Sequence, residues 1–374
     1  MIQRALAKRI QSQMFEGKAF IILGSRQTGK TSLLAEIFPP DQNVLWLSGD
    51  DVDVHTMMKT MNAQRMRALL GDTKIVVIDE AQRIKDIGLR MKVITDQMKD
   101  VQLIATGSSA FELSNRLNEP LTGRKWEYQL YPLSFGEMVA HHGLLAEKRM
   151  LPHRLVYGYY PEVVTSEGKE RDVLKMLADS FMYKDVLAFG GVKKSDKMQT
   201  LLQAIAFQVG SQVSYSELAA TVGIDVKTVE SYIDVLEKCY ILFRLPSLSR
   251  NMRNELKNNR KIYFYDNGIR NALISSFSPI EMRMDKGALW ENFIISERIK
   301  FTAYNHYWCN RFFWRTYDQK EIDYVEDRDG KLSAFEFKYS TRKAVTAPKH
   351  FMAAYPTADF SVVTPDNFED FILG

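Results

Sequence analysis

A glycine-rich run near the start of the chain has the residue types and spacing that bind a phosphate group. It matches the pattern GxxxxGK followed by Ser or Thr, and it comes directly after the apolar stretch 19–23. The glycines let backbone N–H groups turn toward phosphate oxygens, and the helix that follows adds its positive dipole. A chance glycine-rich turn is the alternative. The candidate nucleotide-binding residues are Gly24, Ser25, Arg26, Gln27, Thr28, Gly29, Lys30, Thr31 and Ser32.

Paired acids follow a second apolar stretch, 75–78, about fifty residues downstream. Here Asp79 would hold Mg2+ together with the Thr31 hydroxyl, while Lys30 reaches the β- and γ-phosphates. The next acid, Glu80, would orient or polarise the attacking water. An acid that directly follows the metal-binding acid at a strand end favours nucleotide hydrolysis over binding alone.

Two further residues are candidates for catalysis. A third apolar stretch, 101–106, ends in Gly107 and Ser108, at the sheet edge where open α/β folds bind ligands. We interpret Ser108 as a sensor of the nucleotide, with the N-cap of segment 110–117 as the alternative. We interpret Arg124 as an arginine finger that reaches the γ-phosphate in a neighbouring subunit, with a structural ion pair as the alternative.

The motifs together resemble those of the prokaryotic AAA+ superfamily ATPases that carry a C-terminal nuclease-like domain. The segments Leu121-Thr-Gly-Arg and Tyr131-Pro-Leu-Ser-Phe-Gly-Glu add to this resemblance, which extends over nearly the whole chain. It implies ATP and Mg2+ as ligands. In the family a Gly-Gly-Tyr-Pro-Glu signature brings a proline near the adenine, which implies that role for Pro161. Here the signature reads Gly158-Tyr-Tyr-Pro-Glu, with a tyrosine at the second glycine.

The middle of the chain indicates a helix, a turn at Gly223 and a second helix, which resembles a winged helix-turn-helix. Basic residues then gather in a polar segment that resembles a wing, where only Glu255 opposes them. Such a segment would contact phosphates rather than bases. A solvated loop or a subunit contact is the alternative. The predicted DNA contacts are Arg250, Arg253, Lys257, Arg260 and Lys261.

Acids and a lysine lie on two strand-like stretches near the C-terminus. The two-residue alternation of a strand puts Ile322 and Tyr324 on one face and Asp323 on the other. On the next stretch the same alternation puts Glu336 and Lys338 on one face.

This spacing resembles the PD-(D/E)xK nuclease site. The resemblance implies Asp323 and Glu336 as ligands of Mg2+, and Glu291 as the acid that such sites add from a helix. Lys338 would orient or deprotonate the attacking water. The alternative is a cross-strand ion pair in a fold that does not cut DNA.

The elements that must position these groups follow from the hydrophobic pattern. The first 130 residues alternate short apolar runs with amphipathic stretches, which is typical of a parallel sheet covered by helices. We therefore predict an α/β protein in which a P-loop NTPase core of the AAA+/ASCE type is followed by three further parts. The predicted parts are the core 1–132, a helical lid 133–192, a winged helix 193–275 and an α/β restriction-endonuclease-like domain 276–374.

Composition limits the class of protein. The chain has 374 residues, of which 45% are hydrophobic and 26% charged, so disordered, collagen-like and mini-protein classes are excluded. Two distant cysteines indicate no disulfide framework, and no apolar stretch approaches the roughly 20 residues of a membrane helix. We expect a cytoplasmic protein without a membrane partner. A net charge of +4 permits nucleic-acid binding without requiring it.

Two hypotheses about function follow. The first is an oligomeric, hexameric Mg2+-dependent ATPase that moves along or remodels DNA and cuts it if the nuclease-like site works. The second is a switch controlled by a nucleoside triphosphate, in which the nuclease-like fold serves only as a docking surface.

Overall fold

The structure, a computed structural model, divides into two compact units. It describes residues 2–40, 43–108, 121–180, 195–248, 260–316, 318–340 and 344–374. The first unit comprises residues 1–132 and 238–240, and the second comprises 133–237 and 241–374. The predicted boundaries after residues 192 and 275 both lie inside the second unit and stay predictions. No helix among the described residues is both long and apolar enough to cross a membrane.

The first unit is built on a five-stranded parallel sheet of strand order β2-β3-β4-β1-β5. The apolar stretches 19–23, 75–78 and 101–106 are confirmed as strands of this sheet. β5 was not predicted, because it is an edge strand in which polar and aromatic residues alternate. In chain order the elements are α1 (Leu6–Ser12), β1 (Ala19–Leu23), α2 (Lys30–Ile37), β2 (Val44–Ser48), α3 (Val52–Lys59), α4 (Ala63–Leu70), β3 (Ile75–Asp79), η1 (Ala81–Arg83), α5 (Ile87–Gln97), β4 (Gln102–Gly107) and β5 (Lys125–Gln129).

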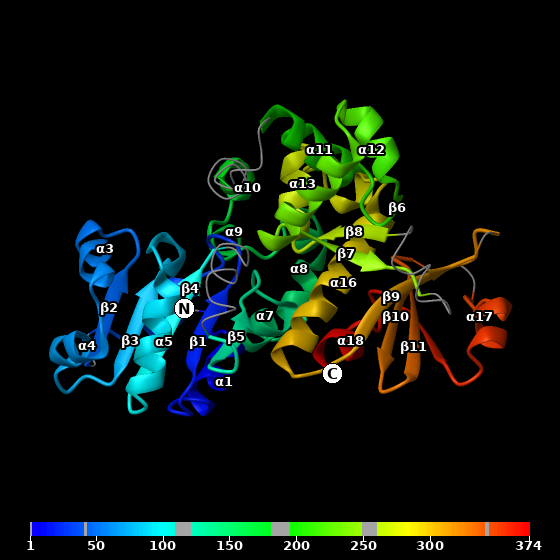
Figure 1. Ribbon diagram of the computed structural model, residues 1–374. Helices are drawn as coiled ribbons and strands as arrows, with labels where there is room; N and C mark the ends of the chain where they lie inside the picture. The colour runs from blue at the N-terminus through cyan, green and yellow to red at the C-terminus, as the bar shows by residue number, and fades with distance from the viewer. Residues whose placement is uncertain are drawn as a thin grey trace. The chain divides into compact units, whose positions relative to one another are not determined.

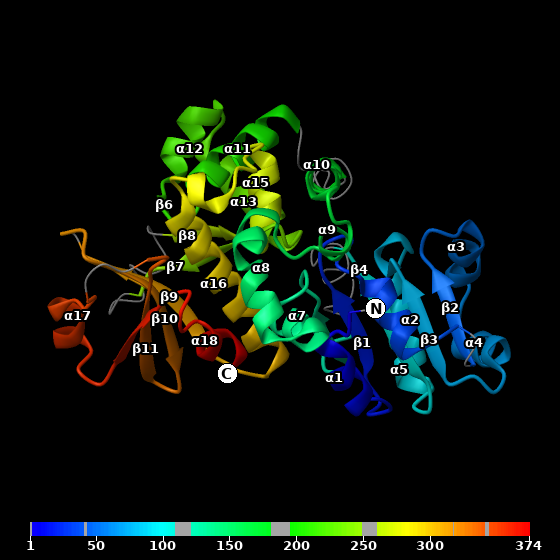
Figure 2. The ribbon, with the colours of Figure 1, turned by 180° about the vertical axis from the view of Figure 1, so that it is seen from behind.

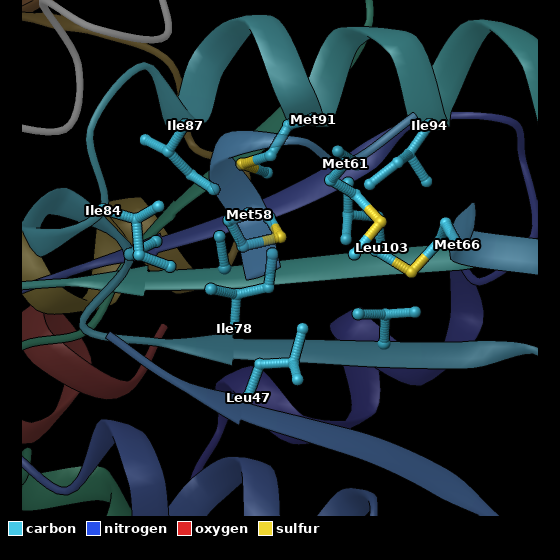
Figure 3. Packing of buried hydrophobic residues seen from close by; sticks show 14 of the residues in the cluster. Leu47, Met58, Met61, Met66, Ile78, Ile84, Ile87, Met91, Ile94 and Leu103 are labelled. Carbon is cyan, nitrogen blue, oxygen red and sulfur yellow. The ribbon is translucent and has the colours of Figure 1, made fainter. Parts of the chain in front are cut away.

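Helices cover both faces of this sheet. Figure 1 shows α5 in front of the strands, and the view from behind in Figure 2 shows α2 on the other side. The apolar residues of α5 recur at helical spacing, so one stripe of the helix faces the sheet. In Figure 3, Ile87, Met91 and Ile94 point from α5 toward Ile78 and Leu103 of the strands beneath. The parallel sheet predicted from the sequence is therefore covered by helices on both faces.

The second unit begins with helices. α7 begins at a capping box in which Ser134 and Glu137 bond each other's backbone N–H groups. The buried faces of α8 and α10 carry Leu155 and Leu174, both fully covered. These elements are α7 (Phe135–His142), α8 (Leu144–Tyr157), α9 (Pro161–Thr165) and α10 (Glu170–Ser180).

The next part has the order helix, short strand, two helices and hairpin. Gly223, at a φ of 72°, ends α12 in the left-handed conformation, as the predicted turn requires. The strands form a three-stranded sheet of order β6-β8-β7. The elements are α11 (Ser195–Phe207), β6 (Gln212–Val213), α12 (Tyr215–Val222), α13 (Val226–Lys238), β7 (Leu242–Pro246), β8 (Arg260–Phe264), α15 (Asn267–Leu273) and η3 (Ile280–Met282).

The chain ends in a four-stranded mixed sheet of order β12-β11-β10-β9. Phe351 of α17 packs with Trp314 and Ile322 in a buried cluster. Glu291 lies on a helix, α16, and the two predicted strand-like stretches are β10 and β11. The elements are α16 (Lys286–Tyr304), β9 (Asn310–Arg315), β10 (Glu321–Arg328), β11 (Lys331–Phe337), α17 (Lys349–Ala354), β12 (Asp359–Val363) and α18 (Glu369–Leu373).

A break in strand register changes the faces of β10. The pairing of β10 with β9 shifts between Ile322 and Val325, so both residues lie in one buried cluster. Tyr324 instead contacts the rings of Phe335 and Phe337. The expectation that Ile322 and Tyr324 share a face is wrong, because a bulge adds a residue to one strand and interrupts the alternation.

Candidate functional site

The glycine-rich run forms a tight loop between β1 and α2. A Cβ at Gly24 would lie 2.1 Å from the Leu130 carbonyl oxygen, so only glycine fits this approach of two backbones. Gly29, at a φ of 89°, begins α2 in the left-handed conformation. The ammonium of buried Lys30 donates to the carbonyl oxygens of Gly24 and Ser25, at 2.8 Å each. The lysine is thus folded back onto the loop that a phosphate would enter.

Asp79 connects this loop to the neighbouring strands. Its Oδ2 accepts a hydrogen bond of 2.8 Å from the Thr31 hydroxyl, and its Oδ1 accepts one of 2.5 Å from Thr106. Parallel pairing of β3 with β4 brings Thr106 beside the end of β3. A hydroxyl and a carboxylate in direct contact are oxygen donors of the kind that Mg2+ prefers. The residues therefore fit a Mg2+ ion bound with a nucleotide.

Glu80 stands in an unusual backbone conformation beside Asp79. Its φ of 51° lies in the left-handed region, and its N–H donates to the Thr106 hydroxyl at 2.9 Å. The Gln82 amide donates to Glu80 Oε2 at 2.6 Å and to Ser108 Oγ at 3.2 Å. A Cβ at Gly49 would lie 2.2 Å from the Glu80 carbonyl oxygen, so the backbone is closely confined here. The predicted residues Glu80 and Ser108 therefore share one amide partner.

Three polar residues at this site were missed in the sequence. Thr106 ends an apolar strand and Gln82 follows the paired acids by two positions, and either spacing could have suggested them. Arg4 carried no such signal, because its partners lie far along the chain. Its buried guanidinium donates to the Thr28 carbonyl oxygen at 2.6 Å and to the Tyr131 carbonyl oxygen at 2.7 Å. Arg4 thus ties the phosphate loop to the end of β5.

Arg124 and Pro161 are further catalytic and nucleotide-binding candidates. Arg124 is partly exposed and forms an ion pair of 2.5 Å with Asp96, as the structural alternative anticipated. Ser108 is the last described residue before position 121, so its capping alternative falls outside the described residues. Pro161 begins α9 in the second unit, and its role at the adenine stays a prediction.

Gly158, three residues before Pro161, lies where only a glycine fits. Asp266 accepts hydrogen bonds from the backbone N–H groups of Tyr159, at 2.6 Å, and Ile269, at 3.1 Å. A Cβ at Gly158 would lie 2.1 Å from Asp266 Oδ1. This loop is therefore fixed to the N-terminus of α15.

The basic segment differs from the expectation at Lys261. Arg250, Arg253 and Lys257 lie outside the described residues. Arg260 is partly buried and donates to the Tyr215 hydroxyl at 3.2 Å. Lys261 is only 1% exposed, which is at odds with a DNA contact. Lys261 is buried because carboxylates from distant parts of the chain surround its ammonium group.

These carboxylates form an acidic centre, defined as Glu291 of α16, Glu321 and Asp323 of β10, and Glu336 of β11. The Lys261 ammonium lies 3.0 Å from Glu291 Oε1, 2.5 Å from Glu321 Oε1 and 3.9 Å from Asp323 Oδ1. The predicted metal ligands Glu291, Asp323 and Glu336 thus lie in one region of the fold. The ammonium of Lys261 lies between the carboxylates of Glu291 and Asp323.

Each carboxylate of the acidic centre has a hydrogen-bond donor. Glu291 Oε1 also accepts from the Tyr263 hydroxyl at 2.5 Å, and Asp323 Oδ2 accepts from the Phe337 N–H at 2.8 Å. Lys338 donates to Glu336 Oε1 at 2.6 Å, so these two residues form an ion pair along one stretch of chain and not the cross-strand pair of the alternative interpretation. The predicted catalytic lysine is thus bonded to a predicted metal ligand.

Burial and crowding change the acidity of these groups. Burial, helped by the charge of Asp323, raises the pKa of the Glu291 carboxyl to about 7. Burial likewise raises the pKa values of Asp323 and Glu336 above their usual range. Burial alone would lower the pKa of the Lys261 ammonium, but the charges of Glu291, Asp323 and Glu321 raise it. Lys261 is therefore held as a cation.

A resident Mg2+ does not fit this arrangement. The Lys261 ammonium contacts the carboxylates that would have to turn their oxygens toward a metal, and it already supplies positive charge there. Among the described residues, no three His, Cys, Asp or Glu side chains are grouped so that they could hold a metal ion. We therefore derive no cleavage step at the acidic centre.

Three families match successive parts of the chain. Residues 16–139 match the family described as "AAA domain". The first unit thus has an AAA-type ATPase fold. Residues 148–279 match "Domain of unknown function (DUF8612)", and residues 286–371 match "Domain of unknown function (DUF4143)". The AAA match supports nucleotide binding by the AAA-type unit.

Similar proteins occur in bacteria and archaea. The chain is 25% identical over 349 residues to the uncharacterized protein Rv2008c of Mycobacterium tuberculosis, covering 92% of this chain and 75% of that protein. It is 26% identical over 334 residues to the uncharacterized protein MJ1637 of Methanocaldococcus jannaschii, covering 77% of this chain and 70% of that protein.

Solved structures give only distant likenesses. A STAND-class signal transduction ATPase of Pyrococcus horikoshii is 12% identical with a TM-score of 0.31, over 82% of this chain and 48% of that one. Domain III of the Thermotoga maritima replication initiation protein DnaA is 16% identical with a TM-score of 0.28, over 61% and 88%. Such low scores carry no conclusion about this chain.

Proposed function

We propose that this chain is a Mg2+-dependent ATP hydrolase that acts on DNA as an oligomer. The observation that carries ATP hydrolysis is the hydrogen-bonded chain from Thr31 through Asp79 and Thr106 to Glu80. It sets a candidate metal-binding pair and a candidate water-activating acid side by side at the end of β3. AAA-type folds use this arrangement for phosphoryl transfer to water.

Each residue of the site has a part in the proposed reaction. Lys30 would exchange its two carbonyl partners for the β- and γ-phosphates of ATP, which offer a stronger, charged acceptor. Thr31 and Asp79 would hold Mg2+, which neutralises phosphate charge when bound. Glu80 would accept the proton of the attacking water as it approaches phosphorus, and Gln82 would keep this carboxylate oriented.

The proposal that the substrate is DNA rests on the second unit. The order of α11, β6, α12, α13 and the β7–β8 hairpin is the order of a winged helix. The face of α13 mixes Lys227 with Glu230, so contacts with phosphates are favoured over base reading. Arg250, Arg253 and Lys257 are the proposed contacts. DNA cleavage is not part of the proposal, because Lys261 bonds the carboxylates that cleavage would need.

DNA is expected to stimulate ATP turnover. We expect a rise of at least about tenfold in steady-state hydrolysis, or roughly 1.4 kcal/mol of barrier, with one of single-stranded, duplex or branched DNA. The assay uses purified protein with Mg2+, and Lys30→Ala, which removes the phosphate contact, gives the background. Slow turnover that no DNA changes would contradict the proposal and favour the nucleotide-controlled switch.

The Arg124 side chain is expected to act between subunits. We expect Arg124→Ala to lower turnover at least about 100-fold without changing the native mass of the assembly, since an arginine finger stabilises charge only in the transition state. Asp96→Asn, which removes the partner of Arg124 in its own subunit, is the matched control and should retain activity. A monomer by native mass spectrometry with ATP present, or full activity of Arg124→Ala, would contradict this proposal.

A further inference from the structure

The β7–β8 hairpin is joined to the C-terminal sheet by backbone contacts. Ser247, just after β7, forms a bridge with Phe313 of β9, and the Leu248 N–H donates to the Phe313 carbonyl oxygen at 2.6 Å. The hairpin therefore reaches the edge of the sheet whose next strand, β10, carries Glu321 and Asp323.

Buried side chains join the hairpin to α16 as well. The Asn292 side chain, fully buried, accepts from the Phe264 N–H at 2.7 Å and donates to the Phe264 carbonyl oxygen at 3.0 Å. Asn267 donates to the Leu289 carbonyl oxygen at 3.0 Å. A Cβ at Gly210 would lie only 3.4 Å from Glu291 Oε2, so the turn before β6 covers this acid. The polar groups of the joint are thus paired inside the protein.

Lys261 lies at the centre of this joint. Lys261 and Tyr263 are two residues apart on β8 and face the same way, and both donate to Glu291 Oε1. Glu321 is shared between Lys261 and Arg315, whose Nη1 lies 3.3 Å from Glu321 Oε2. The four carboxylates of the acidic centre therefore meet three basic side chains, counting Lys338, and little negative charge is left to attract a further cation.

We propose that Lys261 is a built-in cation of the acidic centre, which makes this centre a joint between the hairpin and the C-terminal sheet instead of a divalent-cation site. Removing a buried partner leaves uncompensated charge, which strongly destabilises a protein. Without Lys261 the same oxygen donors would be free to take a metal ion. The inference does not depend on the proposed ATP hydrolysis, because it concerns only the second unit.

Binding of Mn2+ to the full chain, without nucleotide, tests the proposal. Mn2+ accepts the same oxygen donors as Mg2+, and binding removes the EPR signal of the free aqueous ion. We expect wild type and Asp323→Asn to bind equally little Mn2+, and Lys261→Met to bind it at least about tenfold more tightly than wild type. A wild-type site that Asp323→Asn abolishes would overturn the proposal, whether or not Lys261→Met folds. Equal affinities of wild type and folded Lys261→Met would also overturn it.

Thermal unfolding gives a second readout. We expect Lys261→Met to lower the Tm by about 5 °C or more and Mn2+ to restore part of this loss, since a ligand of the folded state alone stabilises it. The matched control is Lys331→Met on β11, where Lys331 pairs with Asp359 at 2.7 Å and both side chains are more than 60% exposed. This control should change little and should not respond to Mn2+. A Tm of Lys261→Met equal to that of wild type would count against the built-in cation.

Discussion

Glu80→Gln is expected to lower the turnover number for ATP by about 100-fold or more while leaving ATP affinity nearly unchanged. The carboxylate at this position is the only part of the proposed machinery that would accept a proton, and loss of a general base costs about 10²–10⁴ in rate. Glutamine keeps the size and the backbone conformation at a φ of 51° but accepts no proton. Steady-state hydrolysis and equilibrium binding of labelled ATP measure the two effects separately.

Two further variants make the Glu80 result interpretable. Glu36→Gln, on the exposed part of α2, makes the same chemical change outside the site and should turn over ATP like wild type. Lys30→Ala should instead lose ATP binding, because Lys30 is the proposed charged contact to the phosphates. If Glu80→Gln kept more than half of the wild-type rate, the water-activating role would have to pass to another residue.

Arg298→Met is expected to destabilise the second unit by about 3–5 kcal/mol, the usual cost of breaking a buried ion pair. Arg298 of α16 bonds both oxygens of Glu326 on β10, at 2.8 Å each, and the Phe371 carbonyl oxygen at 2.6 Å. The two charged side chains are 8% and 1% exposed, so water cannot replace the lost guanidinium. Denaturant unfolding, followed by circular dichroism, measures the change in the free energy of unfolding.

A double variant separates the cost of an orphaned charge from the loss of the arginine side chain. Arg298→Met with Glu326→Met removes both charges and should recover much of the lost stability, because a buried ion pair replaced by apolar residues is often nearly neutral. A loss below about 1 kcal/mol in the single variant would show that Glu326 finds another partner. A double variant as unstable as the single one would mean that the guanidinium packing, and not its charge, stabilises α16 on the sheet.

The two centres differ in how the chain supplies positive charge. At the phosphate loop, Lys30 bonds two backbone carbonyl oxygens, which are weak neutral partners that a phosphate can displace. At the acidic centre, Lys261 bonds carboxylates inside a joint whose backbone is also hydrogen-bonded. The first lysine is therefore available to a ligand, whereas the second is held by its own chain.

Many residues of the candidate nucleotide site could be selected from the sequence, because they belong to short local segments. A phosphate loop is a short backbone turn between one strand and one helix, so the spacing of Gly24, Gly29 and Lys30 is sufficient to recognise it. Asp79 and Glu80 end an apolar strand, and parallel strands bring their carboxyl ends to one edge of a sheet. Strands β1, β3 and β4 of the core were confirmed for the same reason, since each follows a largely apolar run.

Contacts between distant residues were decided only by the tertiary structure. Arg4 reaches Tyr131 across 127 positions, and Lys261 meets Glu291 and Glu321, from α16 and β10 further along the chain. In the sequence Lys261 is one of several basic residues of a polar segment, so it was predicted to be exposed. In the folded chain Lys261 is buried instead, because buried carboxylates need a cation and strand β8 of the hairpin supplies Lys261. Residue type and spacing therefore determined which chemistry is available, and packing decided whether each charged group faces a ligand or another part of the same chain.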